Sequence, residues 1–154
     1  QYLHGMAELI ARPDVMAELR ADPALIPNAV EEMLRWTCPL HYFRRTASCD
    51  TEIAGTPIRA GDKVVMLYSS ANFDEAVFER PMDFDIQRQE NPHMAFGHGI
   101  HLCLGANLAR MEARIFFEEF FKHFAGVELL HAPSYIRSNS IHAFKTMPVH
   151  LLPR

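Results

Sequence analysis

One cysteine, Cys103, stands in a glycine-rich segment that leads into a long apolar stretch with helical periodicity. The N-terminus of a helix has free N–H groups and a partial positive charge, which favour a thiolate over a thiol. The thiolate is the form of cysteine that binds metals. Gly99 and Gly105 permit positive φ and a close approach to a flat ligand, and Phe96 adds an aromatic face. The segment is suited to a metal-binding thiolate, but a lone cysteine at a loop–helix junction is more often a buried structural residue, so both interpretations stay open at this point.

A zinc site is a second interpretation of the same region. His93, His98, His101 and Cys103 are ligand types that zinc accepts, and they lie close together in the sequence. This interpretation gives no role to the glycines between them or to the helix that follows. A flat ligand bound by the thiolate accounts for both features, so we favour it.

Charged side chains at short spacing form two further candidates. Glu32 and Arg35 are three residues apart and share a helix face, but Glu31 and Arg35 are four apart and could pair as well. An exposed pair of this kind contributes only about 0.2–0.5 kcal/mol. Arg44 and Arg45 are adjacent, and a guanidinium fork suits a carboxylate. Their plain alternative is a solvated basic pair at the edge of a strand.

Helices are expected in the first third of the chain, where they would carry the Glu/Arg candidates. Residues 2–10 are apolar at a helical period, and Pro13 limits this helix because proline disfavours helix in the preceding residue. A second helix is expected at residues 13–20, with its proline in the first turn. A third is expected at residues 27–36.

Strands are expected in the middle of the chain. Residues 51–55 and 63–68 are rich in β-forming side chains, and residues 59–62 read as the turn between them. This pattern predicts a small antiparallel sheet. A short helix is expected at residues 71–78, whereas residues 79–95 show no regular period.

The candidate thiolate should be positioned by a turn at residues 97–105 and a long helix at about residues 104–124. Short strands are expected near residues 127–130 and 148–152. Both faces of the long helix are apolar, which predicts burial on two sides: Leu104, Leu108, Met111 and Ile115 on one, and Ala113, Phe117, Phe120 and Phe124 on the other. The fold class is therefore mainly α with small antiparallel β-sheets.

Composition limits the class of protein further. The chain has 154 residues, of which 49% are apolar and 22% charged, as in one globular domain or a compact part of one. A net charge of −4 and the lack of a long apolar run argue against nucleic-acid and membrane partners. Cys38, Cys49 and Cys103 are irregularly spaced, which favours a reducing cytoplasm over a disulfide framework. Gln1 opens inside a periodic segment without a cap or signal peptide, as expected for a piece of a longer chain.

The pattern Phe96-x-x-Gly99-x-His101-x-Cys103-x-Gly105 resembles the haem-binding signature of the cytochrome P-450 family. His101 stands where many members have arginine. The resemblance implies that Cys103 is the proximal ligand to the iron of haem b. It also implies that His101 contacts a haem propionate, that Phe96 packs beside the thiolate, and that Gly99 and Gly105 shape the loop.

The segment Glu32-x-x-Arg35 resembles the Glu-x-x-Arg motif of the same family, on the helix before its small sheet. The resemblance implies a buried structural pair, held by an arginine or histidine from a later meander. Asp83 occupies the usual position of that third member, which is a departure from the family pattern. Arg88 fits a bacterial pattern, but the resemblance does not assign it as the third member.

The segment Arg45-Thr46-Ala47 resembles bacterial members, in which the arginine reaches a haem propionate. The resemblance also implies substrate contacts from residues 40–43 and from the turn at residues 138–144. Both segments are mostly apolar, which fits a lipophilic substrate, although ordinary core residues would look the same. The candidates for substrate contact are Leu40, His41, Phe43 and Ile141.

The resemblance covers nearly the whole chain and is strongest to soluble bacterial members that hydroxylate steroid side chains, terpenoids and branched lipids. It implies that residues 1–154 are the C-terminal haem-binding portion of a single cytochrome P-450 domain, with no catalytic residue besides the haem ligand. The implied reaction inserts one oxygen atom from O2 into a C–H bond of a lipophilic substrate.

Electrons would come from a ferredoxin and its reductase. Arg110 and Arg114 are four apart and form a candidate docking patch, with an ordinary charged helix face as the alternative. Two other functions stay open. One is a haem-thiolate sensor or binding module without turnover. The other is a fragment that is inactive alone, because the oxygen-activating helix is expected before Gln1.

Overall fold

The computed structural model describes residues 2–154, and helices build its first third. These are α1 (Tyr2–Ala11), α2 (Pro13–Ala21), the 3-10 helix η1 (Pro23–Leu25) and α3 (Ile26–Thr37). Pro13 lies in the first turn of α2, where its missing N–H costs nothing, and the Asp22 side chain accepts a hydrogen bond from the backbone of Ala24 at the start of η1. The three predicted helices are therefore confirmed, with closely similar ends.

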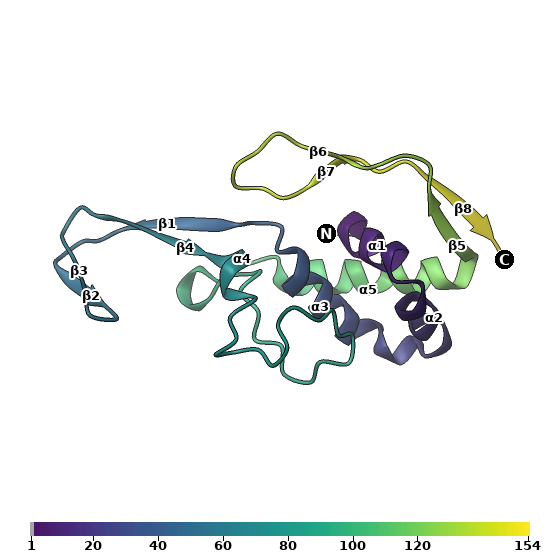
Figure 1. Cartoon of the computed structure of the whole chain (residues 1–154), viewed down its shortest axis with the longest axis horizontal. Coiled ribbons are helices and arrows are strands. Elements are labelled where there is room, and N and C mark those ends of the chain that lie inside the picture. The colour runs from purple at the N-terminus through teal and green to yellow at the C-terminus, as the bar shows by residue number, and fades with distance from the viewer. Residues whose placement is uncertain (1) are drawn as a thin grey trace.

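Short strands in residues 2–154 pair into four two-stranded antiparallel sheets. The pairs are β1 (Tyr42–Thr46) with β4 (Lys63–Leu67), β2 (Thr51–Ile53) with β3 (Thr56–Ile58), β5 (Phe124–Leu129) with β8 (Val149–Pro153), and β6 (Ser134–Tyr135) with β7 (Phe144–Thr146). Figure 1 shows β1 to β4 as an arm that extends away from the helices.

The predicted pairing of residues 51–55 with residues 63–68 is wrong. Ala54 and Gly55 both adopt positive φ, 48° and 79°, so the chain turns back at once and β2 pairs with β3. Glycine adopts such angles without steric cost, which makes this a tight hairpin turn. The partner of β4 is β1, a strand that the sequence pattern did not identify.

The helix predicted at residues 71–78 is also wrong. The observed helix, α4 (Tyr68–Ala71), is a single turn that follows β4 directly. Beyond it, the carboxylate of Asp74 accepts a hydrogen bond from the backbone N–H of Ala76 at 2.9 Å. Such side-chain bonds offer the backbone an alternative to helix. Residues 79–95 contain no helix or strand, as predicted, and lead to the 3-10 helix η2 (Gly99–His101).

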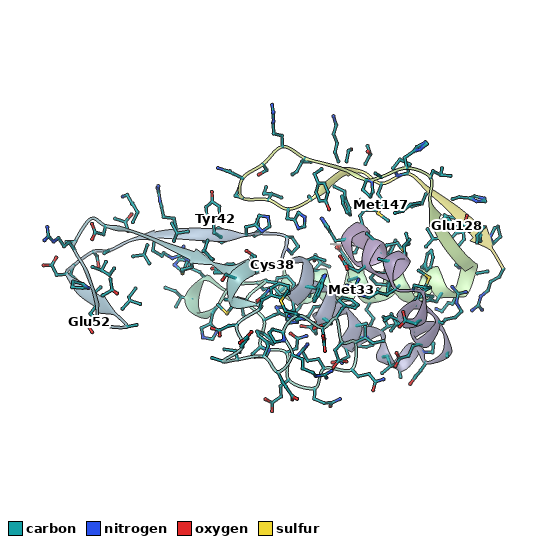
Figure 2. The ribbon with its side chains drawn as sticks, in the orientation of Figure 1. Met33, Cys38, Tyr42, Glu52, Glu128 and Met147 are labelled. Atoms are coloured by element: carbon teal, nitrogen blue, oxygen red, sulfur yellow. The ribbon has the colours of Figure 1, made fainter. Side chains whose placement is uncertain are left out.

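The core is formed where α1, α3 and α5 (Ala106–His123) pack together. Gly5 allows this close packing, because a Cβ there would lie 2.5 Å from the Met33 sulfur and 3.0 Å from the ring of Phe117. Figure 2 shows Met33 beside α1. The helix α3 ends at Cys38, which adopts φ 33° and turns the chain into the arm. Burial raises the pKa of the Cys38 thiol to about 11.

The predicted burial of the long helix on two sides is wrong. Of its second face, Ala113, Phe117 and Phe120 are buried and Phe124 is partly buried. Its first face is exposed, because none of residues 2–154 packs over it: Leu104, Leu108, Met111 and Ile115 all face outward. None of the described helices is long and apolar enough to cross a lipid bilayer.

The hairpin formed by β6 and β7 lies across α1 and is held there by aromatic side chains (Figure 1). The ring of His4 in α1 lies 4.2 Å from the ring of Phe144 and 4.5 Å from that of His142, measured between centroids. His142 is anchored in turn by a hydrogen bond of its Nδ1 with the carbonyl of Thr37, 3.2 Å long. The Nε2 of His4 is buried without a hydrogen-bond partner among the described residues.

Acid is expected to destabilise the fold through His4. Burial, followed by the nearby charge of His142, lowers the pKa of His4 from 6.5 to about 4. Between these values the unfolded chain binds a proton that the folded chain does not, so stability is full above pH 6.5 and falls as the pH drops toward 4. One such group contributes a loss of about 2 kcal/mol between about pH 7 and pH 5.

Urea unfolding at several pH values measures this effect. A His4→Phe variant keeps an aromatic ring in the cluster but cannot be protonated, so its stability should change less over the same range. His150, which is exposed, provides the matched control as His150→Phe. Equal pH dependence of all three proteins would show that His4 is not responsible.

Candidate functional site

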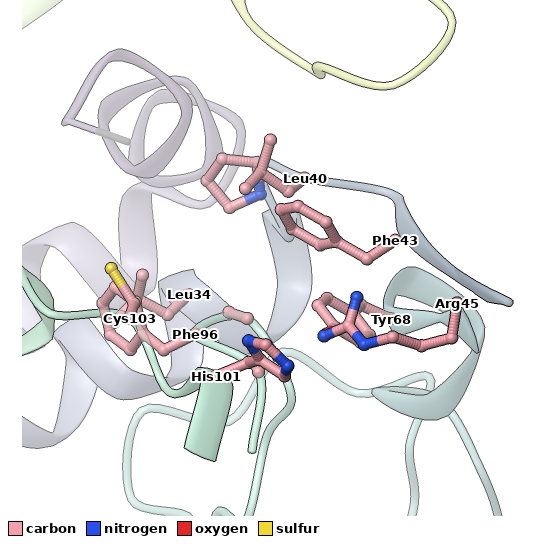
Figure 3. A pocket seen from close by; sticks show the side chains of 11 residues that line it. Leu34, Leu40, Phe43, Arg45, Tyr68, Phe96, His101 and Cys103 are labelled. Atoms are coloured by element: carbon pink, nitrogen blue, oxygen red, sulfur yellow. The ribbon is translucent and has the colours of Figure 1, made fainter. Parts of the chain in front are cut away.

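A cavity of about 470 Å³ lies where the end of α3, the start of β1, α4 and the loop before α5 meet. Its walls are mostly apolar, which is typical of sites for small molecules and cofactors. Figure 3 shows Cys103 and Phe96 at one side, Arg45 at the other, and His101 between them. The lining residues are Leu34, Pro39, Leu40, Phe43, Arg45, Tyr68, Ala95, Phe96, Gly97, His101 and Cys103.

The loop that carries Cys103 is folded by its own backbone hydrogen bonds. The N–H of Cys103 donates to the carbonyl of Phe96 at 2.9 Å, and the N–H of Ala106 donates to the carbonyl of Cys103 at 3.2 Å. Gly97 and Gly99 adopt φ values of 73° and 68°, which favour glycine. The result is an exposed thiol immediately before the first turn of α5.

Gly105 behaves differently from the other glycines of this loop. Its φ is −87°, an angle that any residue adopts, and a Cβ there would meet no atom within 4 Å. Neither the backbone nor a neighbour in residues 2–154 therefore requires glycine at this position. The loop-shaping role predicted for glycine falls, in the structure, on Gly97 and Gly99.

Two cationic or donor side chains line the same cavity as the thiol. Arg45 is partly buried, and its Nη1 donates only to the backbone carbonyl of Arg44, at 3.1 Å. His101 is exposed. Within residues 2–154 neither side chain forms an ion pair with a carboxylate, so both are free to meet acidic groups of a ligand.

Below the cavity, a buried charge cluster ties α3 to the loop at residues 72–91. Glu32 and Arg35 are joined by two hydrogen bonds of 2.7 and 2.8 Å, and both side chains are 0% exposed. The Nε of Arg88 lies 3.2 Å from the second oxygen of Glu32, so Arg88 is the third member of this cluster. The backbone carbonyl of Asp83, and not its carboxylate, accepts from both arginines.

Two asparagines complete this cluster, and sequence reasoning missed both. Asn91 donates to Glu32 at 3.0 Å. Asn72 is fully buried, donates to the carbonyl of Arg35 at 2.9 Å and accepts from the N–H of Met94 at 2.7 Å. Asn72 thereby links the cluster to the segment that leads into the Cys103 loop. Neither residue has a spacing in the sequence that could have revealed these contacts.

The neighbouring Glu31 forms a separate network on the other side of α3. Arg110 of α5 donates two hydrogen bonds to it, of 2.7 and 2.9 Å, and the Nε2 of His93 lies 3.1 Å from it. Burial opposes ionisation of Glu31, but the bonds from His93 and Arg110 outweigh it and lower its pKa to about 2. The same pairing raises the pKa of Arg110.

These contacts bear on two predictions from the sequence, the zinc site and the docking patch of Arg110 and Arg114. His93 faces Glu31, and among residues 2–154 no group of three or more His, Cys, Asp or Glu side chains is placed to hold a metal ion. The zinc cluster is therefore not assembled. Arg110 is neutralised by Glu31, and Arg114 lies 3.5 Å from Glu118, so this helix face carries paired charges.

The predicted substrate-contact residues divide into two pairs. Leu40 and Phe43 line the cavity, whereas His41 and Ile141 do not. Ile141 is nevertheless adjacent, because it forms a β-bridge with Leu40. The N–H of His41 donates to the carbonyl of Ser140 at 3.0 Å, which fastens the turn of the β6–β7 hairpin to the start of the arm. Leu34, Tyr68 and Ala95 also line the cavity and were missed, since an isolated apolar residue has no distinguishing spacing.

Comparisons with known proteins identify the family. The family model described as Cytochrome P450 matches residues 6–133. The chain is 41% identical over 152 residues to the steroid C26-monooxygenase of Mycobacterium tuberculosis (strain H37Rv), covering 97% of this chain and 38% of that protein. It is 45% identical over 148 residues to the methyl-branched lipid omega-hydroxylase of Mycobacterium bovis, covering 95% of this chain and 35% of that protein.

A solved structure gives the same result for the fold. The cytochrome P450 enzyme CYP109B1 from Bacillus subtilis matches with a TM-score of 0.91 and 45% identity, over 96% of this chain and 40% of that one. The chain thus spans 35 to 40% of the length of these three proteins. The predicted fold class, mainly α with small antiparallel sheets, is confirmed as part of the cytochrome P450 fold.

Cytochrome P450 proteins bind haem b, and the cavity can be tested against that group. Haem needs an axial ligand, apolar contact for its flat ring and donors for its two propionates. An exposed thiol, a mostly apolar wall and two side chains without a carboxylate partner in residues 2–154, Arg45 and His101, meet these needs. On the sequence match, the shared fold and this donor set, the chain belongs to the cytochrome P450 family.

Proposed function

We propose that this chain is the haem-binding portion of a haem-thiolate monooxygenase, which inserts one oxygen atom from O2 into a C–H bond of a lipophilic substrate. One observation carries the proposal. The exposed thiol of Cys103 shares an apolar cavity with two side chains, Arg45 and His101, that have no carboxylate partner in the described chain. That combination suits a flat, apolar ligand with acidic substituents and an open axial position.

Each site residue has a defined task in this proposal. Cys103 would bind the haem iron from the N-terminal end of α5, with the ring of Phe96 beside it. Arg45 and His101 would receive the propionates, and the turn made by Gly97 and Gly99 would leave room for the ring. When bound, haem supplies the oxygen-activating chemistry, and the thiolate increases its electron density. The chain contributes position, charge complementarity and exclusion of water.

The proposed substrate is lipophilic because of what surrounds the cavity. Leu40 and Phe43 provide apolar wall, and Ile141 is held beside Leu40 by the β-bridge. Two similar proteins are named for steroid C26 and methyl-branched lipid omega positions. We therefore favour a steroid, a terpenoid or a branched lipid as the substrate.

A ferredoxin and its reductase are the proposed electron donors, in the cytoplasm. The docking site is not assigned to Arg110, because Glu31 neutralises that side chain. Cys38, Cys49 and Cys103 are all free thiols, which supports a reducing compartment. A sensor or binding module without turnover is the second candidate, since the same residues would hold haem in either case.

Isotopically labelled dioxygen separates these two functions. The haem-loaded full chain is incubated with a ferredoxin, its reductase and a panel of steroids and branched lipids, and products are analysed by mass spectrometry. A monooxygenase yields a product that contains one labelled oxygen atom, and labelled water in place of labelled dioxygen gives none. Reduction of the haem without any oxygenated product would instead support the sensor.

A further inference from the structure

Arg110 connects the Glu31 network to the loop of Cys103 through an aromatic ring. Its guanidinium carbon lies 4.6 Å from the centroid of the Phe96 ring, within the range of a cation–π contact. The carbonyl of the same Phe96 accepts the hydrogen bond from the N–H of Cys103. Phe96 therefore contacts Arg110 through its ring and Cys103 through its backbone carbonyl.

Glu31 fixes the position of Arg110 by using both of its oxygens. The Nε donates to Oε1 at 2.7 Å and Nη2 donates to Oε2 at 2.9 Å, which leaves the guanidinium plane little freedom to rotate. The Nε2 of His93 lies 3.1 Å from the same Oε2, and the centroid of its ring lies 6.0 Å from that of Phe96. Lysine could not reproduce this geometry, because it lacks the planar fork.

On the basis of the proposed haem-thiolate function, we propose that Arg110 is a positioning residue for the haem ligand and, together with Glu31, sets the reduction potential of the iron. Arg110 holds the Phe96 ring beside Cys103. Glu31 holds Arg110 and cancels its charge. The pair thus presents a fixed ring and almost no net charge to the iron.

Electrostatics predicts the direction in which each substitution shifts the reduction potential. Reduction of the iron adds one negative charge to the haem, so a nearby cation favours the reduced form and a nearby anion disfavours it. Removing Arg110 alone leaves the carboxylate of Glu31, and removing Glu31 alone leaves the guanidinium of Arg110. The two single changes should therefore shift the potential in opposite directions, a result that loss of packing does not produce.

Potentiometric titration of the haem-loaded full chain tests the proposal. Arg110→Gln should lower the potential and Glu31→Gln should raise it, each by about a tenfold change in the ferrous to ferric ratio. The double variant should return close to the parent value. Arg110→Lys keeps the charge but loses the fork, so it should shift the potential less than Arg110→Gln. Arg114→Gln, one turn along α5, should leave it unchanged.

The outcomes separate this inference from the function on which it rests. Shifts of the same sign in Arg110→Gln and Glu31→Gln, or no shift in either, overturn the role of the pair. If one of these two variants fails to retain haem, the other is compared with Arg114→Gln, and equal potentials in that comparison also overturn the role of the pair. The parent protein's carbon monoxide difference spectrum reports thiolate ligation independently, so a missing thiolate band rejects the proposed function and not only this inference.

Discussion

Replacement of Cys103 by alanine is expected to abolish the carbon monoxide difference band of thiolate-bound haem and all oxygenation of substrate. The reason is chemical. Cys103 is the cavity's one sulfur ligand among the described residues, and the other side chains of that lining that can bind haem iron are His101 and Tyr68. An imidazole cannot donate electron density as a thiolate does, so haem that stayed bound in the variant would have a different spectrum.

The measurement compares the haem-loaded parent with two variants. Cys49→Ala removes another exposed cysteine, one that does not line the cavity, and should leave both band and turnover as in the parent. The variants are compared at equal haem content, so that weaker retention in Cys103→Ala is not mistaken for a change of ligand. A thiolate band that persists in Cys103→Ala would remove the basis of the proposed function.

The Cys103 region could be anticipated from sequence because its determinants are local. The glycines, the aromatic residue, the cysteine and the helix that follows lie within one continuous segment, and positive φ at Gly97 and Gly99 is what glycine permits. The helix is recognised by its own period. No distant contact is needed to predict a cysteine in a glycine-rich turn at the start of α5.

The pair of Glu32 with Arg35 was expected from the resemblance, but the other partners of Glu31 and Glu32 could not be predicted, because they come from distant parts of the chain. Spacing allowed either glutamate to pair with Arg35, yet the structure gives Arg35 to Glu32 and leaves Glu31 to Arg110, 79 residues away. Which of two adjacent side chains is buried depends on how α5 and the loop at residues 72–91 pack against α3. The pairing of β1 with β4 has the same cause, since a β-rich segment does not specify its partner.

Burial of the first face of the long helix was predicted wrongly for a related reason. Periodicity shows that Leu104, Leu108, Met111 and Ile115 are apolar, but it does not show what covers them. In residues 2–154 these side chains are exposed. The periodic pattern therefore identifies apolar residues on one helix face, but it does not identify the segment that would have to pack against them to bury them.

Glu32→Gln is expected to lower the free energy of unfolding by about 3–5 kcal/mol, because it leaves buried charge without a counter-charge. Arg35 is 0% exposed and Arg88 is 6% exposed, and Glu32 is the carboxylate that both contact. Glutamine keeps the size of the side chain, so the loss reflects charge and hydrogen bonding rather than a cavity. Urea unfolding of parent and variant measures the difference.

The adjacent residue provides a matched control. Glu31→Gln is the same chemical change one position away on α3, but its ion pair with Arg110 is 27% and 38% exposed. A pair that reaches solvent is screened and leaves less uncompensated buried charge when it is broken, so this variant should be less destabilised than Glu32→Gln. Equal losses in the two variants would contradict the argument from burial.

The charge cluster should also affect haem retention, through Asn72. Its side-chain oxygen accepts from the N–H of Met94 at 2.7 Å, two residues before Phe96, while its amide donates to Arg35. Because Glu32→Gln loosens Arg35, it should loosen this connection to the ligand loop, and the variant should lose haem at a lower urea concentration than Arg114→Gln. If haem were lost in step with the parent while global unfolding shifted, the cluster would stabilise α3 without positioning the loop of Cys103.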